Sequence, residues 1–293
     1  MANITASDAV AGDPLADEEE YRKEREREEA REERQKIAEE KAPLDALTVY
    51  EVIALHGEEE MRRPTISLWW SGVGAGLGIS ISLYMMATLR VALEGSPNAY
   101  VIEKFGYCFG FLIVVLGRLQ LFTENTITPV LPVLRNRTRE SFTCLARLWG
   151  VVFVANMVGT FIAAATPVFL PAVVTPEQNQ AIYDISLHFA ERSVSDTFWT
   201  AIPAGFLVAA MVWMLPSSKG FEFWTILVMT YAIAVADTSH VIVGSAEIFT
   251  VILHGDLSVL DGFARIFAAG GGNLVGGTLL FAVLAYAQVS EEV

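Results

Sequence analysis

Long apolar runs without a single charge are separated by short polar segments along most of this 293-residue chain. A helix needs about 20 apolar residues to cross the hydrocarbon core of a bilayer, and four runs are that long: residues 66–89, 148–176, 197–218 and 266–290. Two more runs, residues 105–134 and 223–255, carry ionisable side chains near their middle. We therefore expect an all-α membrane protein with six transmembrane helices, of which the second and fifth are broken.

The composition supports a membrane protein. The chain is 53% hydrophobic and only 18% charged, whereas soluble domains are about 25% charged. Residues 1–64 hold 19 acidic and 10 basic side chains, and the remaining 229 residues hold only 15 and 10. The net charge of −14 argues against a nucleic-acid partner, because phosphate binding needs clustered Lys and Arg.

The charged N-terminal part divides in two. Residues 18–41 alternate acidic and basic side chains without an apolar stripe, which is typical of a solvated helix. Residues 44–61 place apolar side chains on one helical face before Pro64, as in an amphipathic helix on the membrane surface or packed on the bundle. The predicted domains are a charged cytoplasmic extension over 1–43 (disordered or a solvated helix), the amphipathic helix leading into the first span over 44–64, and a six-span membrane domain over 65–293.

Lys and Arg near the ends of the spans predict the orientation, because cytoplasmic loops carry an excess of them. Seven fall on the side of the N-terminus: Arg62, Arg63, Arg135, Arg137, Arg139, Arg147 and Lys219. Four fall on the other side: Arg90, Lys104, Arg192 and Arg265. We expect both termini in the cytoplasm.

A short motif indicates an internal duplication. The Asn-Met-Val-Gly that begins at Asn156 recurs as Asn-Leu-Val-Gly at Asn273, 117 residues later, and the same offset carries Thr123 in one break onto His240 in the other. Each half holds three spans, an odd number, so the two halves are expected in opposite orientations. Inverted repeats with paired broken helices place a permeation site near the membrane midplane.

Ionisable side chains at membrane depth are costly and mark functional sites. His240 is the strongest candidate, because an imidazole donates and accepts hydrogen bonds and can exchange a proton with a passing anion; a purely structural histidine is the alternative. Asp237 can orient His240 or cap the second half-helix. Arg118 and Glu124 are expected to form an ion pair between subunits or half-helices, and Glu247 to pack at a helix end or interface.

Polar side chains at the breaks have two interpretations. The Thr123 hydroxyl can contact a permeant or cap a half-helix. Asn156 and Asn273 are expected to hold the broken helices through hydrogen bonds to freed backbone groups. Cys108 and Cys144 match no metal-ligand spacing, and the glycines form no nucleotide-binding motif, so we expect neither a metal nor a cofactor.

Several motifs together resemble the formate/nitrite transporter family, and in particular a poorly characterised branch with an LFTEN loop and a charged N-terminal extension. They are residues 117–123 (GRLQLFT), the two Asn-x-Val-Gly motifs, residues 211–214 (MVWM), residues 239–240 (SH) and the segment 50–64. The resemblance covers residues 45–290.

The resemblance implies a homopentamer in the lipid bilayer of a bacterial inner membrane, each protomer enclosing its own aquaporin-like pore. The expected partners are a small monovalent weak-acid anion, such as formate, nitrite or hydrosulfide, and a proton. It also implies that His240 and Thr123 contact the permeant. Apolar constrictions that reject hydrated ions are expected on either side of them, formed by Leu121, Phe122, Ile233, Tyr107 and Phe111.

The chain also departs from the family. Members carry a lysine in the loop between spans three and four, where residues 188–193 contain none. Either Glu191 takes its place or Arg192 supplies the cation. With Glu124 and Asp237, these residues are the candidate vestibule and selectivity side chains. Gly205 stands where the family has an asparagine.

We therefore expect a channel or transporter for small weak-acid anions, with proton linkage, and not an enzyme, since no nucleophile or HExxH motif occurs. A pore for a neutral or cationic solute is the first alternative, suggested by Glu124 and Glu191. A non-conducting membrane scaffold is the second.

Overall fold

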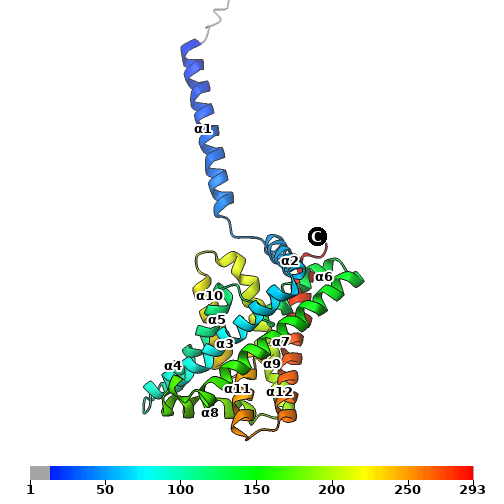
Figure 1. The fold of residues 1–293 in the computed structure, drawn as a ribbon. Coiled ribbons are helices and arrows are strands. Elements are labelled where there is room, and N and C mark those ends of the chain that lie inside the picture. Colours follow the sequence, from blue (N-terminus) through cyan, green and yellow to red (C-terminus); the bar gives the residue numbers. More distant parts are fainter. Residues whose placement is uncertain (1–13, 293) are drawn as a thin grey trace, which may run out of the picture. The chain divides into compact units, whose positions relative to one another are not determined.

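The computed structural model describes residues 14–292, with side chains described for residues 21–36 and 42–292 (Figure 1). It divides into two units, Met1–Leu44 and Asp45–Val293. The first contains helix α1 (Pro14–Lys41), on which Arg25 donates to Glu29 four residues later. Residues 1–13 of the predicted extension lie outside the described residues.

The second unit consists of helices and their connections throughout its described part. The longer helices are α2 (Ala46–Arg62), α3 (Thr65–Ala92), α5 (Phe105–Leu116), α7 (Arg139–Phe169), α8 (Pro176–Ala190), α9 (Val194–Met214), α10 (Glu222–Val235), α11 (Val241–His254) and α12 (Val259–Leu274). Three are short: α4 (Ala99–Glu103), α6 (Val130–Arg135) and α13 (Val283–Val289). A π-helical stretch, Val275–Ala282, joins α12 to α13.

Six spans can be assigned from these helices. In the described chain, five helical segments are long and apolar enough to cross a membrane: Thr65–Ala92, Ala99–Leu116, Arg139–Phe169, Val194–Ser218 and Val259–Val289. Two shorter apolar helices, α10 and α11, follow one another and form the broken fifth span. The second span is broken between α5 and α6, where a short 3-10 turn (Glu124–Thr126) lies.

The helix of the third span begins nine residues before its charge-free run of 148–176 begins, and it ends seven residues before that run ends. Helix α7 already begins at Arg139 and ends at Phe169, so Arg147 lies on the helix and not in a loop. Its guanidinium donates to the backbone oxygens of Met61 and Arg63, and it thereby ties α7 to the end of α2. Beyond Phe169 the chain forms α8, whose Thr175 and Gln178 make a capping box.

The duplication extends to the helices that precede the spans. Helix α2 leads into α3, and α8 leads into α9, each through a connection of a few residues. Both are partly amphipathic, and both pack on the half-helix of a break: α2 on α6, and α8 on α11. Each repeat therefore comprises three spans and one preceding helix.

Glycine allows the closest helix crossings. A Cβ on Gly76 of α3 would collide with the carbonyl oxygen of Asn156 on α7, and one on Gly205 of α9 would collide with that of Asn273 on α12. Small residues at such crossings let backbones approach closely. The Gly205 position, where the sequence lacks an expected asparagine, thus serves the packing of α9 on α12.

Candidate pore site

The two broken spans share one backbone conformation. Two residues after the last residue of α5 and of α10 lies a residue of positive φ that is not glycine, Arg118 (φ 50°) and Asp237 (φ 52°). The next residues, Leu119 and Thr238, donate to carbonyls five residues back, on Val114 and Ile233. The chain then crosses in a non-helical segment before the next half-helix begins. Such strained backbone is concentrated at functional sites.

Two asparagines satisfy the backbone groups that the breaks leave free. The Asn156 amide donates to the carbonyls of Gly72 and Gln120, and its oxygen accepts from Phe122 N at 2.9 Å. The Asn273 amide donates to the carbonyls of Ala201 and Ser239, and its oxygen accepts from Val241 N at 2.9 Å. Both side chains are fully buried. Each asparagine thus joins the first and third spans of its repeat to the break between them.

The single repeat offset of 117 residues does not hold in the breaks. The positive-φ residues Arg118 and Asp237 are 119 apart, as are the segments that follow them. In the structure His240 is therefore equivalent to Leu121, not to Thr123. The asparagines remain 117 apart, because the connection from break to asparagine is two residues shorter in the second repeat.

Thr123 and His240 meet where the two breaks approach each other. Thr123 Oγ1 lies 2.8 Å from His240 Nε2, and both side chains are buried, with exposed fractions of 0% and 2%. His240 Nδ1 accepts from Val243 N at 3.3 Å, which assigns the ring hydrogen of the neutral imidazole to Nε2. Nε2–H then donates to Thr123. Among the described side chains and backbone groups, the Thr123 hydroxyl hydrogen then has no hydrogen-bond acceptor.

Apolar side chains surround this pair. The Phe111 ring packs edge-on against His240 with centroids 5.0 Å apart, and Tyr107 lies 5.3 Å from Phe111 on the same helix. Leu121 and Ile233 are fully buried. Phe122 instead packs its ring against Trp149 and Phe153 of α7. Phe122, one of the five expected constriction residues, thus packs against helix α7.

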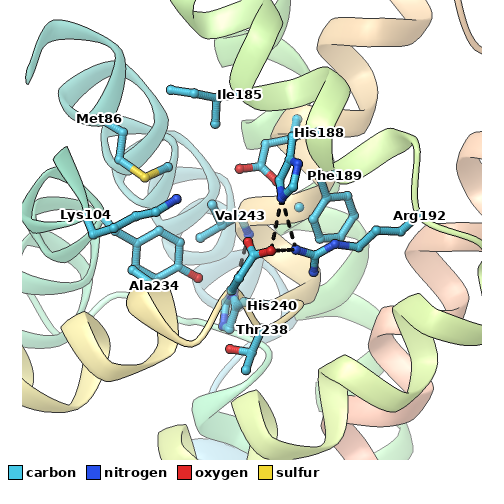
Figure 2. Close-up of a pocket in the computed structure, with 14 residues that line it drawn as sticks. Met86, Lys104, Ile185, His188, Phe189, Arg192, Ala234, Thr238, His240 and Val243 are labelled. Carbon is cyan, nitrogen blue, oxygen red and sulfur yellow. Dashed lines mark hydrogen bonds and ion pairs between the residues drawn. The ribbon is translucent and has the colours of Figure 1, made fainter. Parts of the chain in front are cut away.

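A cavity on the side of α8, here the α8-side cavity, reaches His240 (Figure 2). Arg192 lines it, donates to Ser239 Oγ at 3.0 Å and pairs with Asp237. His188 Nε2 lies 3.0 Å from the same Asp237 carboxylate. Glu191, the other candidate for the family lysine's place, is exposed and does not line the cavity.

Two charged residues of this cavity were not expected there. Lys104, at the start of α5, and Glu247, two turns along α11 from His240, both line it. Lys104 was assigned only to a loop, although its place directly before an apolar run was a usable signal. Glu247 was assigned to a helix end. With Arg192 and Asp237 they give this cavity two cationic and two anionic groups.

A second cavity, here the α2-side cavity, opens toward α2 and has a volume of about 540 Å³. Glu124 lines it, so the structure separates Glu124 from Asp237 and Arg192, with which it was grouped. Gln120 donates to Glu60 at 2.7 Å and accepts from Asn125 at 3.1 Å at its wall.

The expected Arg118–Glu124 ion pair between half-helices is wrong for the protomer. Arg118 is exposed, and no ion pair joins it to Glu124 within the described chain. The positive φ of Arg118 directs the chain into the break, whereas Glu124 begins the 3-10 turn on its far side. The two residues are therefore held in different parts of the cavity wall.

Comparisons with known proteins give one family. The sequence profile of the formate/nitrite transporter family matches residues 47–287. Over 258 residues, 87% of this chain and 83% of the relative, the chain is 40% identical to "Inner membrane protein YfdC" of Escherichia coli (strain K12).

Two solved structures share the fold. An "FNT family ion channel" superposes with a TM-score of 0.72 at 14% identity, over 82% of this chain and 98% of that one. A "Pentameric formate channel with formate bound" superposes with a TM-score of 0.65 at 18% identity, over 78% and 98%. The expected six-span fold with broken second and fifth helices is confirmed. The chain belongs to the formate/nitrite transporter family, a family of transporters and not of enzymes.

Proposed function

We propose that this protein is a transmembrane pore for small monovalent weak-acid anions such as formate or nitrite, and that a proton accompanies the anion. The contact between Thr123 and His240 carries the proposal. One hydroxyl and one imidazole among otherwise apolar, buried side chains favour a small solute without its hydration shell. The family name and the formate bound to one structural neighbour support the solute class.

The surroundings of the pair support an anion that is neutralised on its way. Lys104 and Arg192 in the α8-side cavity can attract an anion. Beyond them, the described part of the constriction offers no fixed cation, and a bare anion in an apolar passage is strongly disfavoured. Crossing as the neutral acid avoids that cost, and His240 and Thr123 then provide hydrogen bonds to it.

We further propose a homopentamer in a bacterial inner membrane, with both termini in the cytoplasm. The pentameric structural neighbour and the inner-membrane relative support the assembly and the location. The excess of Lys and Arg on the α2 side supports the orientation.

A neutral or cationic solute is the second candidate, and one observation favours it. The α2-side cavity is lined by Glu59, Glu60, Glu124 and Glu222, against Arg118 and Lys219. An acidic mouth attracts cations and repels anions.

Flux into proteoliposomes separates these proposals. Purified protein would be tested with formate, nitrite, acetate and methylammonium between pH 5 and 8, beside His240→Ala and Thr123→Ala. We expect anion uptake that increases at acid pH and falls at least about tenfold in His240→Ala, because a buried imidazole hydrogen bond is lost. Uptake of methylammonium without anion uptake would support the second candidate. Absence of any flux would support a scaffold, whereas a transporter lacking residues 1–43 should still conduct.

A further inference from the structure

Glu124 is a half-buried residue whose carboxyl group has no partner in the described chain. Its Oε1 atom is buried and has no hydrogen-bond partner, and no hydrogen bond or ion pair reaches its carboxyl group from the described chain. A buried carboxylate normally requires a counter-charge or several donors, because removing it from water costs several kcal/mol. The buried Oε1 atom has neither here, which favours the neutral acid at this site.

The groups facing Glu124 do not supply the missing charge. The titratable and charged side chains of its cavity are His56, Glu59 and Glu60 from α2, Arg118 from the break, and Lys219 and Glu222 from the segment that begins α10. Glu60 is itself acidic and already binds Arg63 at 2.9 Å and Gln120 at 2.7 Å. Arg118 is exposed, and neither it nor Lys219 forms an ion pair with Glu124.

The position of Glu124 relates it to the constriction. It directly follows Thr123, the residue that binds His240, and it lines the α2-side cavity at the foot of the constriction. A solute in this cavity meets Glu124 before it meets the buried pair. Thr128 Oγ1 donates to the Glu124 backbone oxygen at 3.2 Å, and the Asn125 side chain donates to the Gln120 side chain. These hydrogen bonds hold the backbone at Glu124 and at the residue that follows it.

We propose that Glu124 is the proton donor and acceptor for the solute at the α2-side mouth. This inference rests on the proposed weak-acid function. An anion entering the cavity takes the proton from the Glu124 carboxyl group, the neutral acid passes Thr123 and His240, and it releases the proton in the α8-side cavity. The Glu124 carboxylate regains a proton from water in the open cavity. With the α2 side in the cytoplasm, these steps describe export; for import they run in reverse, and each direction moves one proton with one anion.

Isosteric variants in proteoliposomes test the transfer. Formate would be the probe, with a pH-sensitive dye in the lumen, an imposed membrane potential and protein-free vesicles as background. In the unmodified protein, formate uptake acidifies the lumen and is insensitive to potential. We expect Glu124→Gln to slow this coupled uptake at least about tenfold, within the range of general acid–base effects, and to leave a residual flux that depends on potential. Glu124→Asp, which keeps the carboxyl group, should recover part of the coupled flux.

Glu59→Gln is the matched control. Glu59 lies on the same cavity wall but is exposed, so the same substitution there should leave coupling unchanged. Coupled, potential-insensitive uptake at the unmodified rate in Glu124→Gln would overturn the inference while leaving the proposed anion pore intact. A similar loss in Glu59→Gln would also overturn it, by showing that only the charge of the cavity matters.

An infrared measurement is independent of transport. The difference spectrum of the unmodified protein minus Glu124→Gln at neutral pH should show the carbonyl band of a protonated carboxyl group, and the corresponding Glu59→Gln difference should not. If the unmodified protein moves no formate, the proposed function fails, and the infrared band still decides whether Glu124 stores a proton. Absence of the band would overturn the inference whatever the flux.

Discussion

Leu121 and His240 occupy equivalent positions in the two breaks, each three residues after a residue of positive φ, Arg118 and Asp237. Both are buried, with exposed fractions of 0% and 2%. The duplicated backbone therefore presents an alkyl group at one position and an imidazole at the other. At this position only the second break carries a hydrogen-bonding side chain, and the polar group of the first break is Thr123, two residues after Leu121.

This equivalence predicts the behaviour of a smaller residue at Leu121. Leu121→Ala should widen the passage and admit hydrated ions, so that chloride leaks through proteoliposomes that otherwise exclude it. The change also leaves a cavity and should cost about 2–5 kcal/mol of stability. A thermal unfolding measurement would therefore first show that the variant is folded, and flux would then be measured on the folded protein. Leu121→Ile conserves volume and should keep chloride out; a tight barrier in Leu121→Ala would contradict a role in the constriction.

The α8-side cavity predicts different results for two adjacent residues. Arg192 lines it and Glu191 does not. Arg192→Ala should raise the formate concentration needed for half-maximal uptake severalfold, and raising salt should reduce the difference, because ions screen such attraction. Glu191→Ala is the matched control and should change little. A larger effect of Glu191→Ala than of Arg192→Ala would instead make Glu191 the residue that acts on the anion in the vestibule.

The helix crossing at Gly76 predicts a steric effect on stability. Gly76→Ala places a methyl group against the Asn156 carbonyl and should lower Tm markedly, by several degrees or more. Gly74→Ala on the same helix meets nothing closer than Leu119 Cδ2 at 3.8 Å. It should be neutral or slightly stabilising, since Ala exceeds Gly in helix propensity by up to about 1 kcal/mol. Equal Tm values in the two variants would argue against tight packing at this crossing.

The start of α2 predicts a small dependence of stability on pH. Asp45 caps the helix by accepting from Thr48 N at 2.7 Å, and hydrogen bonding by the side chain and then the backbone of Thr48 lowers the pKa of Asp45. Because the folded pKa is below the unfolded value of about 3.9, the contribution is fully present above that value and is lost as pH falls through the folded pKa. Asp45→Asn should retain the cap and lose this acid sensitivity, whereas Asp45→Ala should loosen α2 at every pH. Hydrogen exchange of the first turn of α2 would measure both.

The spans and both breaks could be predicted because hydrocarbon tolerates few charges, so that charge-free runs and their interruptions are informative. Thr123 and His240 were both singled out from the sequence, but as repeat equivalents; their direct contact was not predicted, and the residue equivalent to His240 is Leu121. The second repeat has two residues fewer between its break and its asparagine, which shifts the alignment of the two breaks by two positions. The short Asn-x-Val-Gly motif cannot reveal such a deletion.

The distribution of side chains between the two mouths could not be predicted. The sequence grouped Glu124 with Asp237 and Arg192, but Glu124 lines the α2-side cavity. A non-helical break sends neighbouring side chains to different sides, so the position of Glu124 next to Thr123 does not tell which cavity it lines. At the end of α8, Glu191 and Arg192 point in different directions for the same reason that any successive residues of a helix do. Only the three-dimensional arrangement assigns Arg192 to the cavity.

The correspondence of α2 with α8 has a consequence for directionality. Each walls one mouth and precedes the first span of its repeat, so the backbone offers a solute similar routes inward and outward. A passage of this kind is intrinsically reversible. Any preference for one direction must therefore come from side chains that differ between the two cavities. The α2-side cavity has four carboxyl groups and two cations, whereas the α8-side cavity has two of each. Exchanging charges between the mouths should therefore alter the preferred direction without rebuilding a helix.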